Sequence, residues 1–282
     1  MNKQKRNAAL LSLAIFATSC GVAGERYETK INRQWPAASI RNLELNEVNG
    51  SVTVEAGAGN EITLVAEVTS RGVAPKKNAE NEGYFTAKVE GDTLRIQRDK
   101  HLTRGRFLFF HNEEVTVNYT LRVPATVTLD LETVNGRITT HGISGATELA
   151  TVNGPIEVDT PGTSELNAHT INGRVRARFI ESFQGATFKT VNGGIEATLP
   201  LSASFSCNLS QVNGDFEAAF PLAIHSNPGS RRVSGEVNGG RYQLKITTVN
   251  GDVEISHAPV TPPAPPAPAA VPVPTVPPSP TV

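Results

Sequence analysis

The stretch that decides the fold runs Leu149-Ala150-Thr151-Val152-Asn153-Gly154-Pro155-Ile156. In it, an Asn-Gly pair separates two runs of apolar and β-branched residues. Asn and Gly both accept positive φ, which suits a tight corner between strands. Taken alone, this stretch predicts no more than two short strands joined by a turn.

The same corner recurs along the chain, and the recurrence is what makes it informative. Asn-Gly occurs eight times in 282 residues, and Val or Ile precedes it every time. From Asn135 to Asn213 the successive intervals are 18, 19, 20 and 21 residues, and a fixed period near 20 is typical of repeat architectures. The corner residues are Asn49, Gly50, Asn135, Gly136, Asn153, Gly154, Asn172, Gly173, Asn192, Gly193, Asn213, Gly214, Asn238, Gly239, Asn250 and Gly251.

Two apolar columns appear when the units are aligned on the β-branched residue before Asn. Four places after it stand Val52, Ile138, Ile156, Val175, Ile195, Phe216 and Val253. Three places before it stand Leu45, Leu131, Leu149, Ala168, Phe188, Leu209 and Ile246. Only the Asn238 copy breaks both columns, with Arg241 and Ser234 at these places. Each unit is therefore predicted to be a strand, an Asn-Gly corner, a second strand and a looser turn.

Units of 18–21 residues fit an all-β, single-domain β-solenoid, in which each coil buries its apolar face against its neighbours. A long meander of hairpins is the alternative. Residues 51–125 lack the repeat, but 61–68, 93–96 and 115–121 alternate with period two and predict further strands. In either architecture, the Asn-Gly pairs are interpreted as structural corners. We expect Gly173 and Gly193 to need positive φ, so that Val at either is more destabilising than Val at Gly240.

The two ends of the chain differ from the repeat region. Residues 1–19 have a basic start and a short apolar run, as in an export signal. Ala17-Thr18-Ser19-Cys20 resembles a bacterial lipoprotein signal, in which Cys20 is lipidated and becomes the mature N-terminus; ordinary cleavage after Gly24 is the alternative. Residues 20–39 form a linker and first strand, and residues 40–257 the repeat domain. Residues 258–282 form an uncharged tail with eleven prolines, either an extended spacer or a disordered terminus.

Composition excludes several classes of protein. The chain has 26 basic and 27 acidic side chains, which argues against a nucleic-acid binder, since such proteins usually carry a basic excess. Two cysteines exclude a disulfide framework and a cysteine-rich metal site.

A family resemblance rests on the stretch Val117-Asn118-Tyr119-Thr120-Leu121-Arg122-Val123-Pro124, the Thr-Val-Asn-Gly units that follow it, and the closing Thr248-Val249-Asn250-Gly251-Asp252-Val253. Over residues 40–256 the sequence resembles the bacterial putative-adhesin family of β-strand-repeat proteins of unknown function. The resemblance implies an exported, repetitive β domain, and it brings no catalytic residues with it.

No catalytic constellation, cofactor site or metal site is predicted. The six histidines, His101, His111, His141, His169, His225 and His257, show no metal-ligand spacing. Paired carboxylates can cleave glycans on β-helices, and Asp130, Glu132, Glu157 and Asp159 are candidates for such a role. A charged outer face of half-buried strands explains them equally well. The aromatic stretch from Arg104 to His111 is either a cap for one end of the repeat or a patch that meets a partner or a membrane.

The expected function follows from the export signal and the repeat. We expect a lipid-anchored, non-enzymatic envelope protein of the outer membrane or periplasm, which acts as an adhesin-like binding or structural module. Glycans, cell-wall polymers and envelope proteins are the candidate ligands. The alternatives are a polysaccharide-acting enzyme and a self-assembling scaffold whose ends stack.

Overall fold

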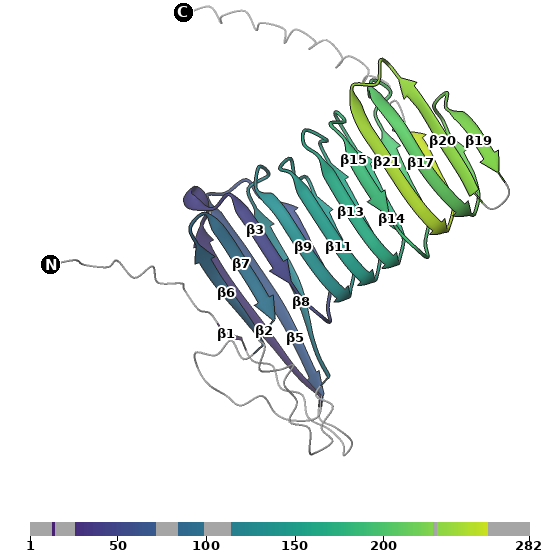
Figure 1. The fold of residues 1–282 in the computed structure, drawn as a ribbon. Helices are drawn as coiled ribbons and strands as arrows, with labels where there is room; N and C mark the ends of the chain where they lie inside the picture. The colour runs from purple at the N-terminus through teal and green to yellow at the C-terminus, as the bar shows by residue number, and fades with distance from the viewer. Residues whose placement is uncertain (1–12, 15–25, 72–83, 99–113, 228–229, 259–282) are drawn as a thin grey trace, which may run out of the picture.

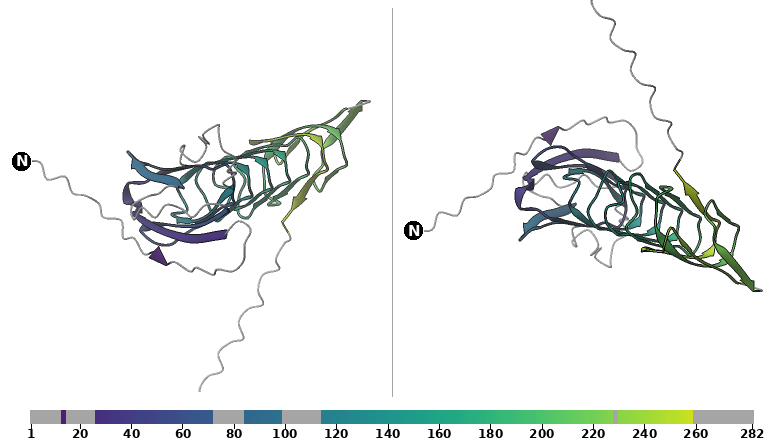
Figure 2. Two further views of the ribbon diagram at one scale, coloured as in Figure 1. Left: turned by 90° about the horizontal axis from the view of Figure 1, so that it is seen from below. Right: turned by 90° about the horizontal axis from the view of Figure 1, so that it is seen from above.

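The computed structural model describes residues 13–14, 26–71, 84–98, 114–227 and 230–258. Two eleven-stranded sheets lie face to face along an elongated body, and the core fills the space between them (Figures 1 and 2). Sheet A runs in the order β1 (Leu13–Ala14), β2 (Arg26–Pro36), β5 (Glu61–Arg71), β8 (Glu114–Val123), β4 (Val52–Ala56), β10 (Ile138–His141), β12 (Ile156–Thr160), β14 (Val175–Phe179), β16 (Ile195–Leu199), β22 (Val253–His257) and β18 (Phe216–Ala218). Sheet B runs in the order β6 (Phe85–Glu90), β7 (Thr93–Arg98), β3 (Asn42–Asn46), β9 (Thr128–Asn135), β11 (Thr147–Asn153), β13 (Leu166–Asn172), β15 (Ala186–Lys189), β21 (Tyr242–Asn250), β17 (Phe205–Asn213), β20 (Ser230–Val237) and β19 (Ala223–Asn227).

Each repeat unit supplies one strand to each sheet, and successive units pair in parallel. In sheet B, Leu149 lies between Leu131 and Ala168. In sheet A, Ile156 lies between Ile138 and Val175. The two aligned columns of the sequence are therefore two stacks of core side chains. Parallel pairing also rules out the hairpin meander for these units, because hairpins pair antiparallel.

Burial follows the two-residue period of a strand. Inward residues of the repeat strands are buried and outward residues are exposed, as in β9, where Leu129, Leu131 and Thr133 are buried and Asp130, Glu132 and Val134 are exposed. Four phenylalanines pack together in the C-terminal part of the core. Phe183 packs edge to face on Phe179 and Phe205, and Phe205 packs in the same way on Phe220, with ring centroids 5.0–5.8 Å apart.

The last repeat unit does not occupy the last place in the stack. Strands β21 and β22 pair with β15 and β16 on one side and with β17 and β18 on the other. The chain therefore passes over one position and builds the outermost unit first. It then forms the antiparallel pair β19–β20 beside β17 and returns to fill the gap. In Figure 1 the yellow-green β21 accordingly lies between β15 and β17.

The N-terminal part closes the other end with antiparallel strands. Strand β8 pairs parallel with β4, and β5 and β2 follow it antiparallel. In sheet B, β7 pairs parallel with β3, and β6 pairs antiparallel with β7. The strands predicted within 61–68, 93–96 and 115–121 are confirmed as parts of β5, β7 and β8.

The all-β prediction is confirmed: over the residues that the structure describes, the only helical segment is the 3-10 turn η1 (Ala37–Ser39). No helix in this part of the chain is long and apolar enough to cross a membrane. Most of the export signal, together with Cys20, the aromatic stretch from Arg104 to His111 and the tail from residue 259, lies outside the described residues.

Candidate interaction surface

The Asn side chains of the corners form one continuous ladder. Each amide nitrogen donates to the amide oxygen of a neighbouring unit, for example Asn153 Nδ2 to Asn135 Oδ1 at 2.8 Å and Asn172 Nδ2 to Asn153 Oδ1 at 2.8 Å. All six links measure 2.8–2.9 Å. In spatial order the ladder runs Asn49, Asn135, Asn153, Asn172, Asn192, Asn250 and Asn213. A one-residue slip would break every link, so the ladder fixes the register.

A second ladder lies just beneath the first. The Thr two places before Asn points inward and is buried, as at Thr151 and Thr170. Its hydroxyl donates to the glycine carbonyl of the neighbouring unit, from Thr151 to Gly136 and from Thr170 to Gly154, both at 3.1 Å. This role explains why Thr recurs in the Thr-Val-Asn-Gly units. The recurrence is visible in the sequence, but the sequence alone did not indicate its role.

The prediction of positive φ at Gly173 and Gly193 is wrong. Among the corner glycines, positive φ occurs at Gly50, Gly214, Gly239 and Gly251. At Gly173 a Cβ atom would instead overlap the carbonyl oxygen of Gly154 in the neighbouring unit, and Gly193 stands in the same relation to Gly173. Glycine is required because the backbones of stacked corners approach too closely for a side chain.

The Asn238 copy belongs to a different structure. It lies in the turn between β20 and β21, where Asn238 adopts φ 48°. Its amide nitrogen donates to the carbonyl oxygens of Leu201 and Ala203, at 3.1 and 2.9 Å. Asn238 therefore takes no part in the ladder, as its broken columns in the sequence indicate.

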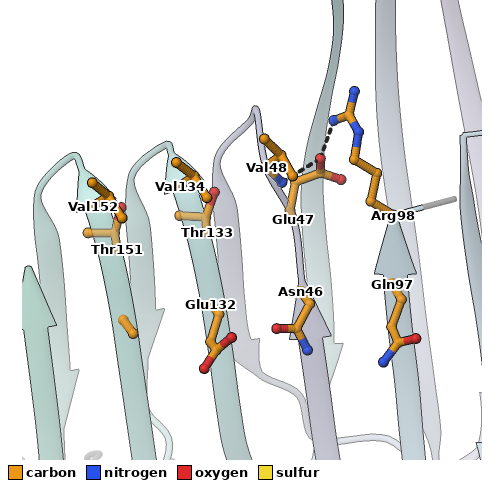
Figure 3. Close-up of a pocket in the computed structure, with 11 residues that line it drawn as sticks. Asn46, Glu47, Val48, Gln97, Arg98, Glu132, Thr133, Val134, Thr151 and Val152 are labelled. Carbon is orange, nitrogen blue, oxygen red and sulfur yellow. Dashed lines mark hydrogen bonds and ion pairs between the residues drawn. The ribbon is translucent and has the colours of Figure 1, made fainter. Parts of the chain in front are cut away.

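The β-branched residues before Asn form an apolar row on the outer face of sheet B, which we call the corner ridge. In spatial order it comprises Val48, Val134, Val152, Ile171, Val191, Val249 and Val212. Figure 3 shows its first three members side by side at the tips of neighbouring units. Of the eight exposed large hydrophobic side chains among the described residues, five lie on this ridge, and Ile171 is the most exposed of these at 45%. A continuous apolar row of this kind marks a contact surface more often than scattered single residues do.

Two polar columns run beside the corner ridge on the same face, and their charge changes sign along the body. Towards the N-terminal end they carry Glu44, Asp130, Glu132 and Glu148, of which Glu44 is paired with Arg95 at 2.7 Å. Towards the C-terminal end they carry Lys189 and Lys245, with Arg232 on the adjacent strand. The pKa of Asp130 is raised, mainly by partial burial and also by the neighbouring Glu132, Glu148 and Glu44 carboxylates. These two columns therefore have an acidic half and a basic half, while Glu236 on β20 adds a negative charge beyond the basic half.

A shallow groove of about 630 Å³ lies where the corner ridge meets the N-terminal strands. At its end, Glu47 occupies the place that Thr holds in the other units, and its side chain is fully buried. It accepts hydrogen bonds from Arg98 (Figure 3) and from the Val48 amide at 2.8 Å. It also accepts one from the Tyr119 hydroxyl at 2.7 Å. Burial, followed by the adjacent Glu47 carboxylate, raises the pKa of Tyr119. With these partners, Glu47 completes the Thr ladder at this end.

The four carboxylates singled out from the sequence do not form one site. Asp130 and Glu132 point outward from sheet B, whereas Glu157 and Asp159 point outward from sheet A. Asp159 accepts two hydrogen bonds from Arg178, both at 2.9 Å, and Glu157 accepts one from Arg137 at 2.8 Å. These ion pairs link neighbouring units across the sheet, which is the role expected of a charged outer face.

Histidine and cysteine give no metal site within the described part of the chain. No group of three His, Cys, Asp or Glu side chains is placed to hold an ion there. His141 contacts Asp159 at 3.2 Å. The pKa of His169 is lowered, mainly by burial and also by the Lys189 charge. His101 and His111 lie outside the described residues.

We expect the Cys207 thiol to be unreactive in the folded protein. Its side chain is buried in the core, and burial raises the pKa of the thiol to about 12. Almost none of it is therefore thiolate at pH 8, and the thiolate is the reactive form. Labelling of Cys207 by a membrane-impermeant thiol reagent should be at least about a hundredfold slower in the native protein than in denaturant. Equal labelling rates in the two states would contradict the burial.

Comparison with known protein families gives a match for part of the chain. Residues 125–256 match the family model described as Toastrack DUF4097, which confirms the resemblance to the putative-adhesin family over a shorter stretch than residues 40–256. A comparison with curated proteins gave no match.

Three solved structures match the chain in a structural comparison, at low sequence identity. A putative cell adhesion protein from Clostridium sporogenes is 9% identical, with a TM-score of 0.43, and the match covers 84% of this chain and 100% of that one. A putative adhesin from Bacteroides fragilis is 11% identical, with a TM-score of 0.28, covering 80% and 96%. A putative lipid binding protein from Parabacteroides distasonis is 9% identical, with a TM-score of 0.37, covering 81% and 96%.

Proposed function

We propose that this chain, whose residues 125–256 form a Toastrack DUF4097 domain, is an exported cell-envelope protein that binds extended ligands with the long outer faces of its two sheets. Its action is adhesin-like and non-enzymatic. The proposal rests on the regular spacing of the outer faces, since stacked units present outward side chains in aligned rows, one row per strand. Such a face suits a polymer whose contacts also repeat.

The proposed organisation supports this role. Residues 40–257 act as one β-solenoid domain of stacked units, stiffened by the Asn and Thr ladders. Residues 1–19 direct export, residues 20–39 supply a linker and the first long strand, β2, and residues 258–282 form an uncharged, Pro/Ala-rich tail. The family and the three structures are described as adhesins, a lipid binding protein or a domain of unknown function, and none as an enzyme.

The test is a binding array of glycans and cell-wall polymers probed with the full chain. We expect binding to at least one polymer class, with no chemical change to the polymer. Contact energy spread over many rows implies that single substitutions such as Glu157→Gln, Asp159→Asn or Glu132→Gln each change the affinity by less than about fivefold. Turnover of a polysaccharide, abolished by one of these substitutions, would overturn the proposal in favour of an enzyme.

Anchoring is predicted to depend on Cys20. A thioether-linked lipid at Cys20, with more than one acyl chain, holds a protein durably at a membrane, whereas one chain does so only marginally. Cys20→Ser should therefore move most of the protein from the membrane fraction to the soluble fraction of the cell. Cys207→Ser is the matched control and should leave the distribution unchanged. Retention of Cys20→Ser in the membrane fraction would exclude the lipid anchor.

A further inference from the structure

We propose that the outer face of sheet B binds a second copy of this chain, antiparallel, with the two corner ridges packed together at the centre of the interface. This inference goes beyond polymer binding: in the dimer the outer face of sheet B is covered, and the outer face of sheet A stays open to a polymer. Three observations indicate that the ridge is covered by a second copy.

The first observation is the spacing of the ridge. Its members sit on neighbouring paired strands, so they repeat about every 4.8 Å. A second copy presents the same spacing, so each Val or Ile side chain of one ridge can pack against a Val or Ile of the other along its whole length. Stacked β structures pack their side chains against each other in this way.

The second observation is the charge on the two flanking columns. Antiparallel pairing about Ile171, the central member, brings the acidic half of one copy over the basic half of the other. In this arrangement β9 lies opposite the partner's β21, so Asp130 faces Lys245 of the second copy. Val152 faces Val191, and Ile171 faces its own equivalent on the two-fold axis. A surface that complements itself in this way is what a two-fold dimer requires.

The third observation is the extent of the face. Seven rows by three columns cover about 34 Å by about 20 Å, or about 700 Å² per copy, which is close to the ~800 Å² per partner of a standard interface. Only the antiparallel arrangement overlays all three columns. A parallel two-fold arrangement centred on the ridge overlays the ridge alone, because the sheets then extend in opposite directions.

The test is disulfide cross-linking of the full chain in cells that export it. Ile171→Cys places a cysteine on the two-fold axis, where it can meet its equivalent at disulfide distance. Ile180→Cys is the matched control, because Ile180 is 53% exposed but lies off the ridge. We expect the Ile171→Cys chain to form a covalent dimer in at least about tenfold higher yield than the Ile180→Cys chain. The unmodified chain, with Cys20 and Cys207, gives the background.

A charge exchange tests the antiparallel geometry. Asp130→Lys or Lys245→Asp alone should lower the cross-linking rate through Ile171→Cys about threefold or more, because like charges then meet at both ends of the interface. The two changes together restore opposite charges, and the rate should return. The pair Val152→Cys with Val191→Cys provides a second cross-link that does not depend on Ile171.

Three results would overturn the proposal. The first is equal dimer yield from Ile171→Cys and Ile180→Cys, which indicates random collision. The second is the absence of rescue by the double charge exchange. The third is that the chain is a monomer and that a thiol reagent labels Ile171→Cys only when the residues after Ala258 are removed. That result would show that the chain's own tail covers the ridge. Each result leaves the polymer-binding array unaffected, so the two proposals can fail separately.

Discussion

Gly173→Ala should lower the free energy of unfolding by about 3 kcal/mol. Its Cβ would overlap the carbonyl oxygen of Gly154, and that carbonyl belongs to the stacked backbone and accepts a hydrogen bond from Thr170. Relief requires the two corners to separate, which strains the Asn link between Asn153 and Asn172. Forced overpacking in a close-packed interior typically costs 1–3 kcal/mol, and more when backbone must move. Urea unfolding of the full chain measures the loss.

Two control glycines separate close approach from other effects. At Gly59 an added Cβ has only the Glu61 amide nitrogen nearby, at 3.9 Å, so Gly59→Ala should change stability by less than about 0.5 kcal/mol. At Gly240 the φ is +65° and the added Cβ would meet the flexible Glu236 side chain at 3.1 Å, so Gly240→Ala should cost about 1 kcal/mol. A loss at Gly173 no greater than that at Gly240 would remove close stacking as the reason for glycine at the corners.

The repeat was readable from the sequence because two periodicities agree in it. The alternation of each strand and the recurrence near 20 residues put Leu149 and Ile156 in columns that the structure stacks in the core. Parallel stacking requires an equivalent residue in every unit, and this requirement appears in the sequence as residues that recur at fixed positions. The same logic identified Asn238 as an outlier, because a residue outside the stack is free of that constraint.

The remaining features depend on contacts between units, which one unit's sequence does not specify. Any unit with matching columns can stack on any other, so the place of β21–β22 before β17–β18 is decided by the path of the chain through β19–β20. The irregular intervals of 25 and 12 residues after Asn213 are the only trace of it. Glycine at position 173 is likewise required by the close approach of the neighbouring corner and not by its own φ. Turn rules consider one corner at a time, so they gave the wrong reason for this glycine.

The buried Glu47 side chain has a neutral counterpart, Gln211, at the opposite end of the stack. Between the ends, Thr fills the ladder position, and its hydroxyl reaches the next glycine carbonyl. At one end Glu47 pairs with Arg98, and at the other Gln211 accepts a hydrogen bond from Arg231 at 2.9 Å. At both ends a longer polar side chain thus occupies the Thr position and bonds to an arginine. Gln211 also donates to the Gly251 carbonyl at 2.8 Å, as Thr does in the other units.

Arg98→Met should therefore destabilise the protein by about 3–5 kcal/mol. The Arg98 side chain is 11% exposed and that of Glu47 fully buried, and a buried carboxylate that loses its cation pays its desolvation cost without compensation. Glu47→Gln combined with Arg98→Met removes both charges. The Gln amide oxygen can accept from the Val48 amide, which lies 2.8 Å from one Glu47 oxygen, and its NH2 group can donate to the Tyr119 hydroxyl oxygen, which lies 2.7 Å from the other. The double variant should recover to within about 1 kcal/mol of the parent. Urea unfolding of the four proteins of this double-mutant cycle yields the coupling energy. If the two losses simply add, the pair does not stabilise this end of the stack through its charges, and the resemblance to Gln211 and Arg231 is one of position alone.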